Sequence, residues 1–184
     1  MLWLWIVIGI VVVLLLFVVL TYNKLVRLRN EAKTGWANID VQLRRRSDLV
    51  PNLVAAVKGY AAHESQTFEE VTKARSAAQQ ASGPAAAAQA DAAMAPALNK
   101  LLAVSEAYPQ LRASENFLAL QQELADIEDK LAAARRYYNQ TVYRYNTVKQ
   151  SFPAVVIAGP LGFKEREFFE TDRRDPVNVS FAPA

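Results

Sequence analysis

The chain opens with an uninterrupted apolar run. From Leu2 to Leu20 every position except Gly9 is plainly apolar, and the run holds neither a charged residue nor a proline. A helix of this length extends about 28 Å, close to the roughly 30 Å hydrocarbon core of a bilayer. The pattern therefore predicts a transmembrane anchor over residues 1–22, with residues 2–20 in contact with lipid.

A cleaved signal peptide is the competing interpretation of this run. It would require a basic segment before the apolar stretch and small residues at a cleavage site after it. No basic side chain precedes Trp3, and the run ends through Val19 and Leu20, so both features are missing. We therefore expect the anchor to be retained. Trp3, Trp5 and Tyr22 lie where interfacial aromatic residues belong.

Basic residues gather on one side of the anchor. Lys24, Arg27, Arg29 and Lys33 all follow it, whereas only the chain's own amino group precedes it. Because basic residues favour the cytoplasmic side of a membrane, the pattern predicts an N-terminus outside and a cytoplasmic domain. The rule is statistical, and a periplasmic domain remains the alternative.

Two heptad seams predict two long helices, because apolar residues recur at alternating steps of three and four. The first seam continues out of the anchor without a linker, which predicts a single rod with a kink or short break at Pro51. Its positions are Ala32, Trp36, Ile39, Leu43, Arg46, Val50, Leu53, Val57 and Tyr60. The second seam comprises Phe117, Leu120, Leu124, Ile127, Leu131, Ala134, Tyr138, Thr141, Tyr145, Val148 and Phe152.

Two shorter helical segments lie between the long ones. One starts near Glu64, the other ends near Tyr108, and they meet at residues 82–84 in an alanine-rich stretch. Pro96 is expected in the first turn of the later segment. Short connections predict an all-α, antiparallel up-and-down bundle over residues 23–152. A full turn at the break gives four helices, which is the favoured arrangement, and a kink gives three arms.

The pattern changes after Phe152. Residues 154–163 are apolar but have no helical period, and the charged remainder is predicted to be irregular. Residues 153–184 therefore form a C-terminal tail. If the last helix descends toward the bilayer, this tail either packs against the end of the bundle or contacts lipid.

Composition and charge argue against several classes of function. The chain contains no cysteine, which excludes disulfides and thiolate chemistry, and a net charge of +3 is small for a nucleic-acid-binding protein. The one histidine, His63, lies at a predicted helix junction, and the Glu-x-x-His pairs of di-metal bundles are missing. No glycine-rich phosphate loop occurs. We therefore expect no catalytic residue, cofactor, metal site or nucleic-acid partner.

Two arginines fall on helical seams where an apolar residue would normally lie. These are Arg46 on the first long helix and Arg75 on the shorter one that follows. A buried charge must be paired or must reach solvent. Our hypothesis is that at least one arginine pairs with Glu123 or Glu128 of the last helix and forms a structural polar seam. Extension of the arginine side chain to the surface is the alternative.

Six stretches, in order along nearly the whole chain, carry a joint resemblance to a known family. They are Tyr22-Asn23 with Leu25-Val26; Trp36 to Leu43 (WANIDVQL); Arg45 to Glu64 (RRSDLVPNLVAAVKGYAAHE); Glu106 to Gln122 (EAYPQLRASENFLALQQ); Ala134 to Asn139 (ARRYYN); and Phe152 to Phe169. Together they resemble the LemA family of bacterial membrane-anchored proteins. The resemblance implies an outside N-terminus, one anchor in the inner membrane, an antiparallel four-helix bundle and no catalytic residues.

Two hypotheses for function follow. Some LemA relatives are linked to organising membranes and some are encoded near membrane proteases, which implies a scaffold or adaptor. The first hypothesis is therefore a membrane-anchored scaffold that binds itself, or a partner such as a membrane protease system, through exposed helix faces. The alternative is membrane remodelling or anionic-lipid binding through the basic residues 24–33 and the apolar tail at 154–163. Neither hypothesis makes the protein an enzyme.

Overall fold

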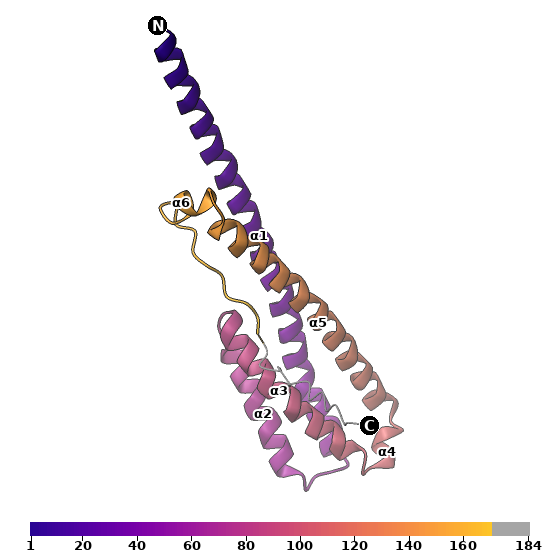
Figure 1. The fold of residues 1–184 in the computed structure, drawn as a ribbon. Helices are drawn as coiled ribbons and strands as arrows, with labels where there is room; N and C mark the ends of the chain where they lie inside the picture. Colours follow the sequence, from indigo (N-terminus) through magenta and orange to yellow (C-terminus); the bar gives the residue numbers. More distant parts are fainter. Residues whose placement is uncertain (171–184) are drawn as a thin grey trace, which may run out of the picture.

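The computed structural model describes residues 1–170, and that part of the chain is helical without strands (Figure 1). The helices are α1 (Leu2–Lys58), α2 (Ser65–Gln80), α3 (Pro84–Ser105), α4 (Pro109–Arg112), α5 (Glu115–Gln150) and α6 (Ala154–Ala158). The predicted all-α fold is confirmed. Residues 171–184 of the predicted tail lie outside the described residues.

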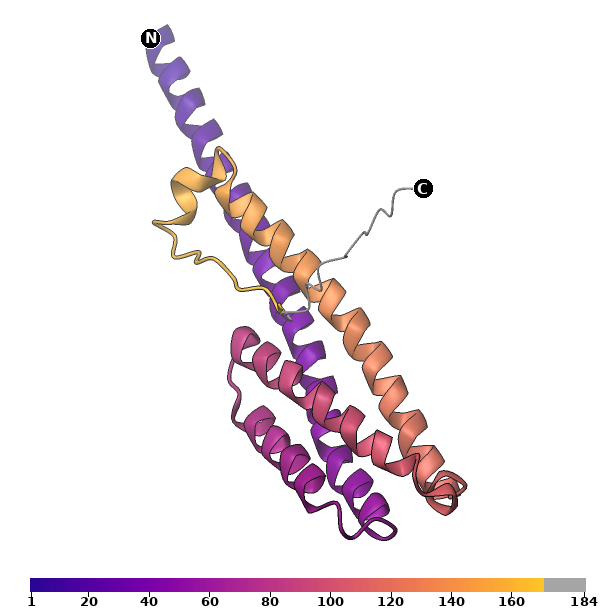
Figure 2. The same cartoon turned by 60° about the horizontal axis from the view of Figure 1, so that its bottom comes forward.

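Helix α1 is one continuous rod of 57 residues. Its first part projects beyond all other elements in both views (Figures 1 and 2), and it is long and apolar enough to cross a membrane. The predicted continuity between the anchor and the first helix is confirmed. The short break considered at Pro51 is wrong, since the helix passes through that residue.

Helix α5 runs antiparallel to α1 and carries the second seam. Every seam position from Phe117 to Val148 is buried or half-buried, which confirms the predicted periodicity. Phe152 is 84% exposed, because α5 ends at Gln150 before the seam is complete. The two long helices approach closely at Gly35, where an added Cβ would lie 3.2 Å from the Cα of Tyr138.

Helices α2 and α3 form a hairpin that covers the halves of α1 and α5 far from the anchor (Figure 2). Gly83 adopts a φ of 84°, in the left-handed region that favours glycine, and Pro84 then starts α3. The break at residues 82–84 is therefore a full turn, and the predicted arrangement with four helices (α1, α2, α3 and α5) is confirmed. Pro96 lies inside α3 rather than in its first turn.

The largest apolar core fills this membrane-distal half. It is built from α1, α2, α3 and α5 with Leu111 of α4, and it includes Leu49, Val50, Leu53, Val57, Phe68, Val71, Met94, Leu98, Leu101, Leu111, Phe117, Leu120, Leu124 and Ile127. Burial of each large aliphatic side chain contributes about 1.5–3 kcal/mol. The distal core therefore supplies most of the apolar stabilisation of the bundle.

The tail folds back over the membrane-proximal half. After α6, the chain runs extended along α1 and α5 toward the tip of the α2–α3 hairpin, as the yellow segment of Figure 1 shows. We call residues 163–169 the strap. It has no helix or strand, as predicted for the segment after Phe163, but it is docked on the bundle. Phe163 and Phe169 at its two ends are 4% and 2% exposed.

Candidate functional site

Two Tyr-Asn pairs on α5 face the strap. Tyr138-Asn139 and Tyr145-Asn146 are separated by one heptad in the sequence. Because seven residues make about two helical turns, both pairs lie on the same face of α5. They form the floor of a groove that the strap occupies, and we call it the strap groove.

Each asparagine makes a two-point contact with the main chain of the strap. Asn146 Nδ2 donates to the Arg166 carbonyl over 2.8 Å, and its Oδ1 accepts from the Arg166 N–H over 3.0 Å. Asn139 binds Phe169 in the same way, over 3.0 Å and 2.9 Å. A side-chain amide used in this manner satisfies both polar groups of an extended residue, as a neighbouring β-strand would.

The two tyrosines complete the contact. Tyr145 donates its hydroxyl to the Lys164 carbonyl over 2.7 Å, and Tyr138 donates to the Glu167 carbonyl over 2.8 Å. Burial raises the pKa of both phenols above the ordinary value of 10.0, and the nearby Arg166 only partly opposes this. Both hydroxyls therefore remain donors at neutral pH. The groove recognises an extended backbone and does not depend on strap side chains for these hydrogen bonds.

Aromatic rings fix the two ends of the strap. The Phe163 ring lies 5.6 Å from the Tyr22 ring and 5.4 Å from the Arg29 guanidinium. At the other end, the Arg135 guanidinium lies 5.3 Å from the Phe169 ring. Such cation–π contacts contribute about 0.5–1 kcal/mol at exposed sites and more when desolvated. Tyr22 and Arg29, which we predicted to lie at the membrane interface, thus also contact the strap.

A buried network of charged side chains lies next to the Phe169 end of the strap. Arg46 Nη1 is 2.6 Å from Asp91 Oδ1 on α3, and Arg46 Nη2 is 2.7 Å from Glu128 Oε1 on α5. Arg135 pairs with the second oxygen of Asp91. The side chains of Arg46 and Asp91 are each 4% exposed, so removal of either partner would leave a desolvated charge. The network joins α1, α3 and α5 at the boundary between the two halves.

Arg75 has a different role from Arg46. Pro51 has no N–H, so the carbonyl of Ser47 lacks its usual partner in the α1 ladder. Arg75 Nε on α2 donates to that carbonyl over 2.9 Å. The α2 side chain thereby replaces the missing bond, which explains why α1 continues through Pro51 and why an arginine stands on the seam of α2.

The structure brings together some of the residues singled out from the sequence and leaves others apart. Glu128 meets Arg46, whereas Glu123 is exposed and has no ion pair within residues 1–170. The remaining predicted interface residues lie exposed along α1; they are Trp3, Trp5, Lys24, Arg27 and Lys33. No group of three or more histidine, aspartate or glutamate residues that could hold a metal occurs in the described part.

Comparison with known proteins decides the family. A model described as the LemA family matches residues 35–181. The chain belongs to the LemA family. It is similar to the magnetosome protein MamQ of Magnetospirillum gryphiswaldense, at 26% identity over 80% of this chain and 64% of that protein. It is also 26% identical to MamQ 1 of Paramagnetospirillum magneticum, over 87% of this chain and 68% of that protein. It is 26% identical to protein LemA of Metamycoplasma hominis, over 85% of this chain and 72% of that protein.

These comparisons confirm the resemblance and make the chain a membrane-associated LemA-family protein. The chain spans under two thirds of the length of the MamQ protein of M. gryphiswaldense. The names of the relatives are not enzyme names.

Sequence reasoning missed three residues of this LemA-family site. Asp91 lies in the alanine-rich stretch, where few large side chains mark the buried face. Asn139 and Asn146 lie beside the seam of α5 and look like ordinary surface residues. Their one available signal was the Tyr-Asn dipeptide repeated at heptad spacing, which no apolar pattern explains.

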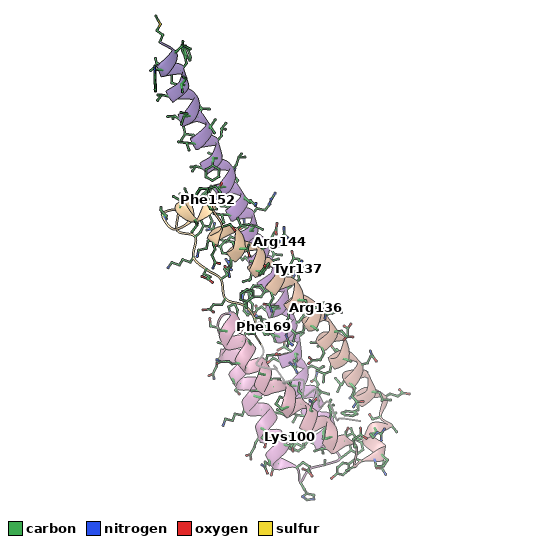
Figure 3. All side chains as sticks on the ribbon, viewed as in Figure 1. Lys100, Arg136, Tyr137, Arg144, Phe152 and Phe169 are labelled. Atoms are coloured by element: carbon green, nitrogen blue, oxygen red, sulfur yellow. The ribbon has the colours of Figure 1, made fainter. Side chains whose placement is uncertain are left out.

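A second surface of the LemA-family bundle is open to solvent. Val41 on α1 and Tyr137 on α5 are 46% and 45% exposed. Figure 3 shows Tyr137 along α5 between Arg136 and Arg144. Tyr137 separates two shallow hollows between α1 and α5, of about 560 and 370 Å³. We call Val41 and Tyr137 the open face.

Proposed function

We propose that this LemA-family protein is a membrane-anchored scaffold that associates with copies of itself and with other proteins through its α1–α5 rod. The open face carries this proposal. An exposed tyrosine, an arginine seven residues further along the same face of α5 (Arg144) and an exposed valine on α1 have the composition of a binding hot spot, in which tyrosine and arginine are enriched. A rod fixed in the membrane presents this surface at a constant height to every neighbouring copy.

The proposed orientation has the N-terminus outside the bacterial inner membrane and the bundle in the cytoplasm. Lys24, Arg27, Arg29 and Lys33 support it, since all four follow the anchor directly. Protease treatment of spheroplasts tests it. A C-terminal tag that survives until the membrane is opened agrees with a cytoplasmic bundle, and a tag digested in intact spheroplasts contradicts it.

The scaffold itself is tested by trapping partners in the native membrane. A photo-reactive amino acid replaces Tyr137 in the full chain, and Tyr60, which is 49% exposed in the loop after α1, is replaced as the matched control. We expect a discrete adduct from position 137 with a second copy, and with other chains where they bind, but none from position 60. The absence of any adduct at 137, together with a strictly monomeric detergent extract, would overturn the proposal.

The second candidate function, contact with lipid by the tail, gains support from the position of α6. The loop around α6 lies beside α1 at the end of the anchor, where Phe163 meets Tyr22. Four apolar side chains of this loop are exposed; they are Phe152, Val155, Val156 and Leu161. Exposed apolar groups beside a membrane anchor favour insertion among the lipid headgroups.

Labelling at one position tests this contact. The chain has no cysteine, so Val156→Cys accepts an environment-sensitive dye at a single site. In vesicles containing brominated lipid we expect quenching at Val156→Cys and none at Gln66→Cys, which is exposed on α2 far from the anchor. Equal fluorescence with and without brominated lipid at position 156 would exclude the membrane contact.

A further inference from the structure

The strap is bound in a way that requires little of its sequence. In every hydrogen bond between the strap and α5, the strap contributes a main-chain atom and α5 a side-chain atom. The side chains of Lys164, Glu165 and Glu167 are exposed. Only the two phenylalanines at its ends are buried. The groove therefore accepts an extended segment with two suitably spaced aromatic residues, and the segment on this chain that fits it is the strap.

The strap is joined to the bundle through a short hinge. Residues 159–162 connect α6 to the strap and include Gly159 and Gly162. Gly162 has a φ of 77°, a conformation that glycine adopts readily, and no atom lies within 4 Å of a Cβ built on either glycine. The turn is closed by backbone hydrogen bonds from the N–H groups of Leu161, Gly162 and Phe163, and the space around the two glycines leaves room for the strap to leave α6 along another path once these bonds open.

The anchor places the grooves of neighbouring copies at the same height above the membrane. Each strap starts at Phe163, beside Tyr22 at the end of the anchor, and descends along its own α5. In a neighbouring copy the same groove lies at the same level, so exchange requires only a sideways movement. Confinement to a membrane also raises the effective concentration of the second groove.

We propose that the strap is exchanged between copies, so that residues 163–169 of one chain occupy the groove formed by Tyr138, Asn139, Tyr145 and Asn146 of the next. An exchanged strap makes the same hydrogen bonds as a strap bound to its own chain, which keeps the free-energy difference between the two arrangements small. Mutual exchange closes a pair of copies, and one-way exchange extends a row. The inference deepens the proposed scaffold function and rests on it, because it names the contact through which copies join.

Cysteine cross-linking tests the exchange. Lys149 Nζ on α5 and Glu165 Oε2 on the strap are 4.0 Å apart. A chain with both Lys149→Cys and Glu165→Cys reports the strap on its own bundle. Two differently tagged full-length chains, one with Lys149→Cys and the other with Glu165→Cys, are then expressed together and treated in native membranes with a short thiol-specific cross-linker. A product that joins the two tags and depends on Asn139 and Asn146 of the groove indicates an exchanged strap.

We expect the mixed chains to give the inter-chain product, and its share to fall at least fivefold when Asn139→Leu and Asn146→Leu are added to the Lys149→Cys chain. Asn99→Leu is the matched control, because Asn99 is exposed on α3 and should leave the product unchanged. The proposal is overturned if the doubly substituted chain cross-links within itself while the mixed chains do not. It is also overturned if the inter-chain product is insensitive to the asparagines, or if no strap cross-link forms at all.

The same membranes separate this inference from the scaffold function. If the photo-reactive residue at position 137 still joins two copies while the mixed cysteine chains remain separate, the scaffold stands and strap exchange fails. If neither experiment joins two copies and position 137 traps no other protein, both proposals fail.

Discussion

The two halves of the α1–α5 pair are covered in different ways. In the membrane-distal half, the α2–α3 hairpin adds aliphatic side chains to a common core. In the membrane-proximal half, the strap adds main-chain groups that asparagine and tyrosine side chains bind, with one aromatic ring at each end. Apolar burial makes the α2–α3 hairpin part of the cooperative fold. The strap, held by six hydrogen bonds and two buried rings, should open at a lower free energy than global unfolding.

The largest effect should come from a cavity in the distal half. Leu101 on α3 is fully buried in the distal core, and Leu101→Ala removes its packing. We expect a loss of about 3–4 kcal/mol in the free energy of unfolding, measured by urea titration of the full chain in detergent. Leu118→Ala is the control, because Leu118 is 50% exposed on α5 and should change stability by less than about 0.5 kcal/mol. Equal effects of the two substitutions would contradict the assignment of the core.

The second-largest loss of stability should come from the buried charge network at the boundary between the two halves. Arg46→Met leaves the buried Asp91 with Arg135 as its remaining partner. We expect a loss of about 3 kcal/mol, at the lower end of the usual cost of breaking a buried pair. Thermal unfolding followed by circular dichroism measures it. An unchanged or higher melting temperature in both Arg46→Met and Glu128→Gln would show that the network does not help to specify the fold.

Replacement of Arg75 should reduce stability less than replacement of Arg46, although both arginines lie on apolar seams. Arg75→Met leaves the Ser47 carbonyl without a partner, which should cost about 1–2 kcal/mol. Pro51→Ala restores an N–H for the same carbonyl, so the cost of Arg75→Met should largely vanish in that background. A double-mutant cycle measured by urea unfolding gives the coupling energy. Independent, additive effects would mean that Arg75 does not replace the missing bond.

The contrast between the halves also explains how much the sequence predicts. The seams of α1 and α5, apart from their exposed last positions Tyr60 and Phe152, and the break at residues 82–84 follow from spacing and from turn chemistry, and the structure confirms them. It also shows an N-terminal helix that is long and apolar enough to cross a membrane, as the apolar run predicts. The strap could not be found in this way, because its bonds join Asn146 to a main-chain group of Arg166 and so leave no pattern in the apolar residues. Asp91 was missed for a related reason: alanine neighbours do not define a face as large side chains do.

A local effect is expected in the proximal half. Asn146→Leu removes both hydrogen bonds to Arg166 and leaves the distal core intact. The loss of about 1.4 kcal/mol of local stability corresponds to a tenfold faster hydrogen exchange of the strap amides, read by mass spectrometry, while the global melting temperature changes little. Asn99→Leu, on the exposed side of α3, should leave strap exchange unaltered. A fall in global stability as large as that of Leu101→Ala would mean that the strap belongs to the cooperative core.

The smallest effect is a dependence of the strap on alkaline pH. Burial raises the pKa of Tyr138 and Tyr145 above 10.0 in the folded protein, so the unfolded chain loses these protons first. Their contribution to stability is complete below pH 10.0 and is lost as the pH rises through the raised values. Ionisation also removes the donors to the Glu167 and Lys164 carbonyls, so strap release should accompany it.

Ultraviolet absorbance of phenolate and the fluorescence of a dye on Glu165→Cys report these two events in one titration. With both Tyr138→Phe and Tyr145→Phe in place, the late-ionising phenolates disappear and the strap signal no longer changes with their titration. With Tyr108, which packs partly buried against the distal core, replaced by phenylalanine, the distal half should show no matching step, because the side chains of its buried core do not ionise. A distal transition at the same pH would mean that the two coverings open together, and the strap could then not be exchanged while the bundle stays folded.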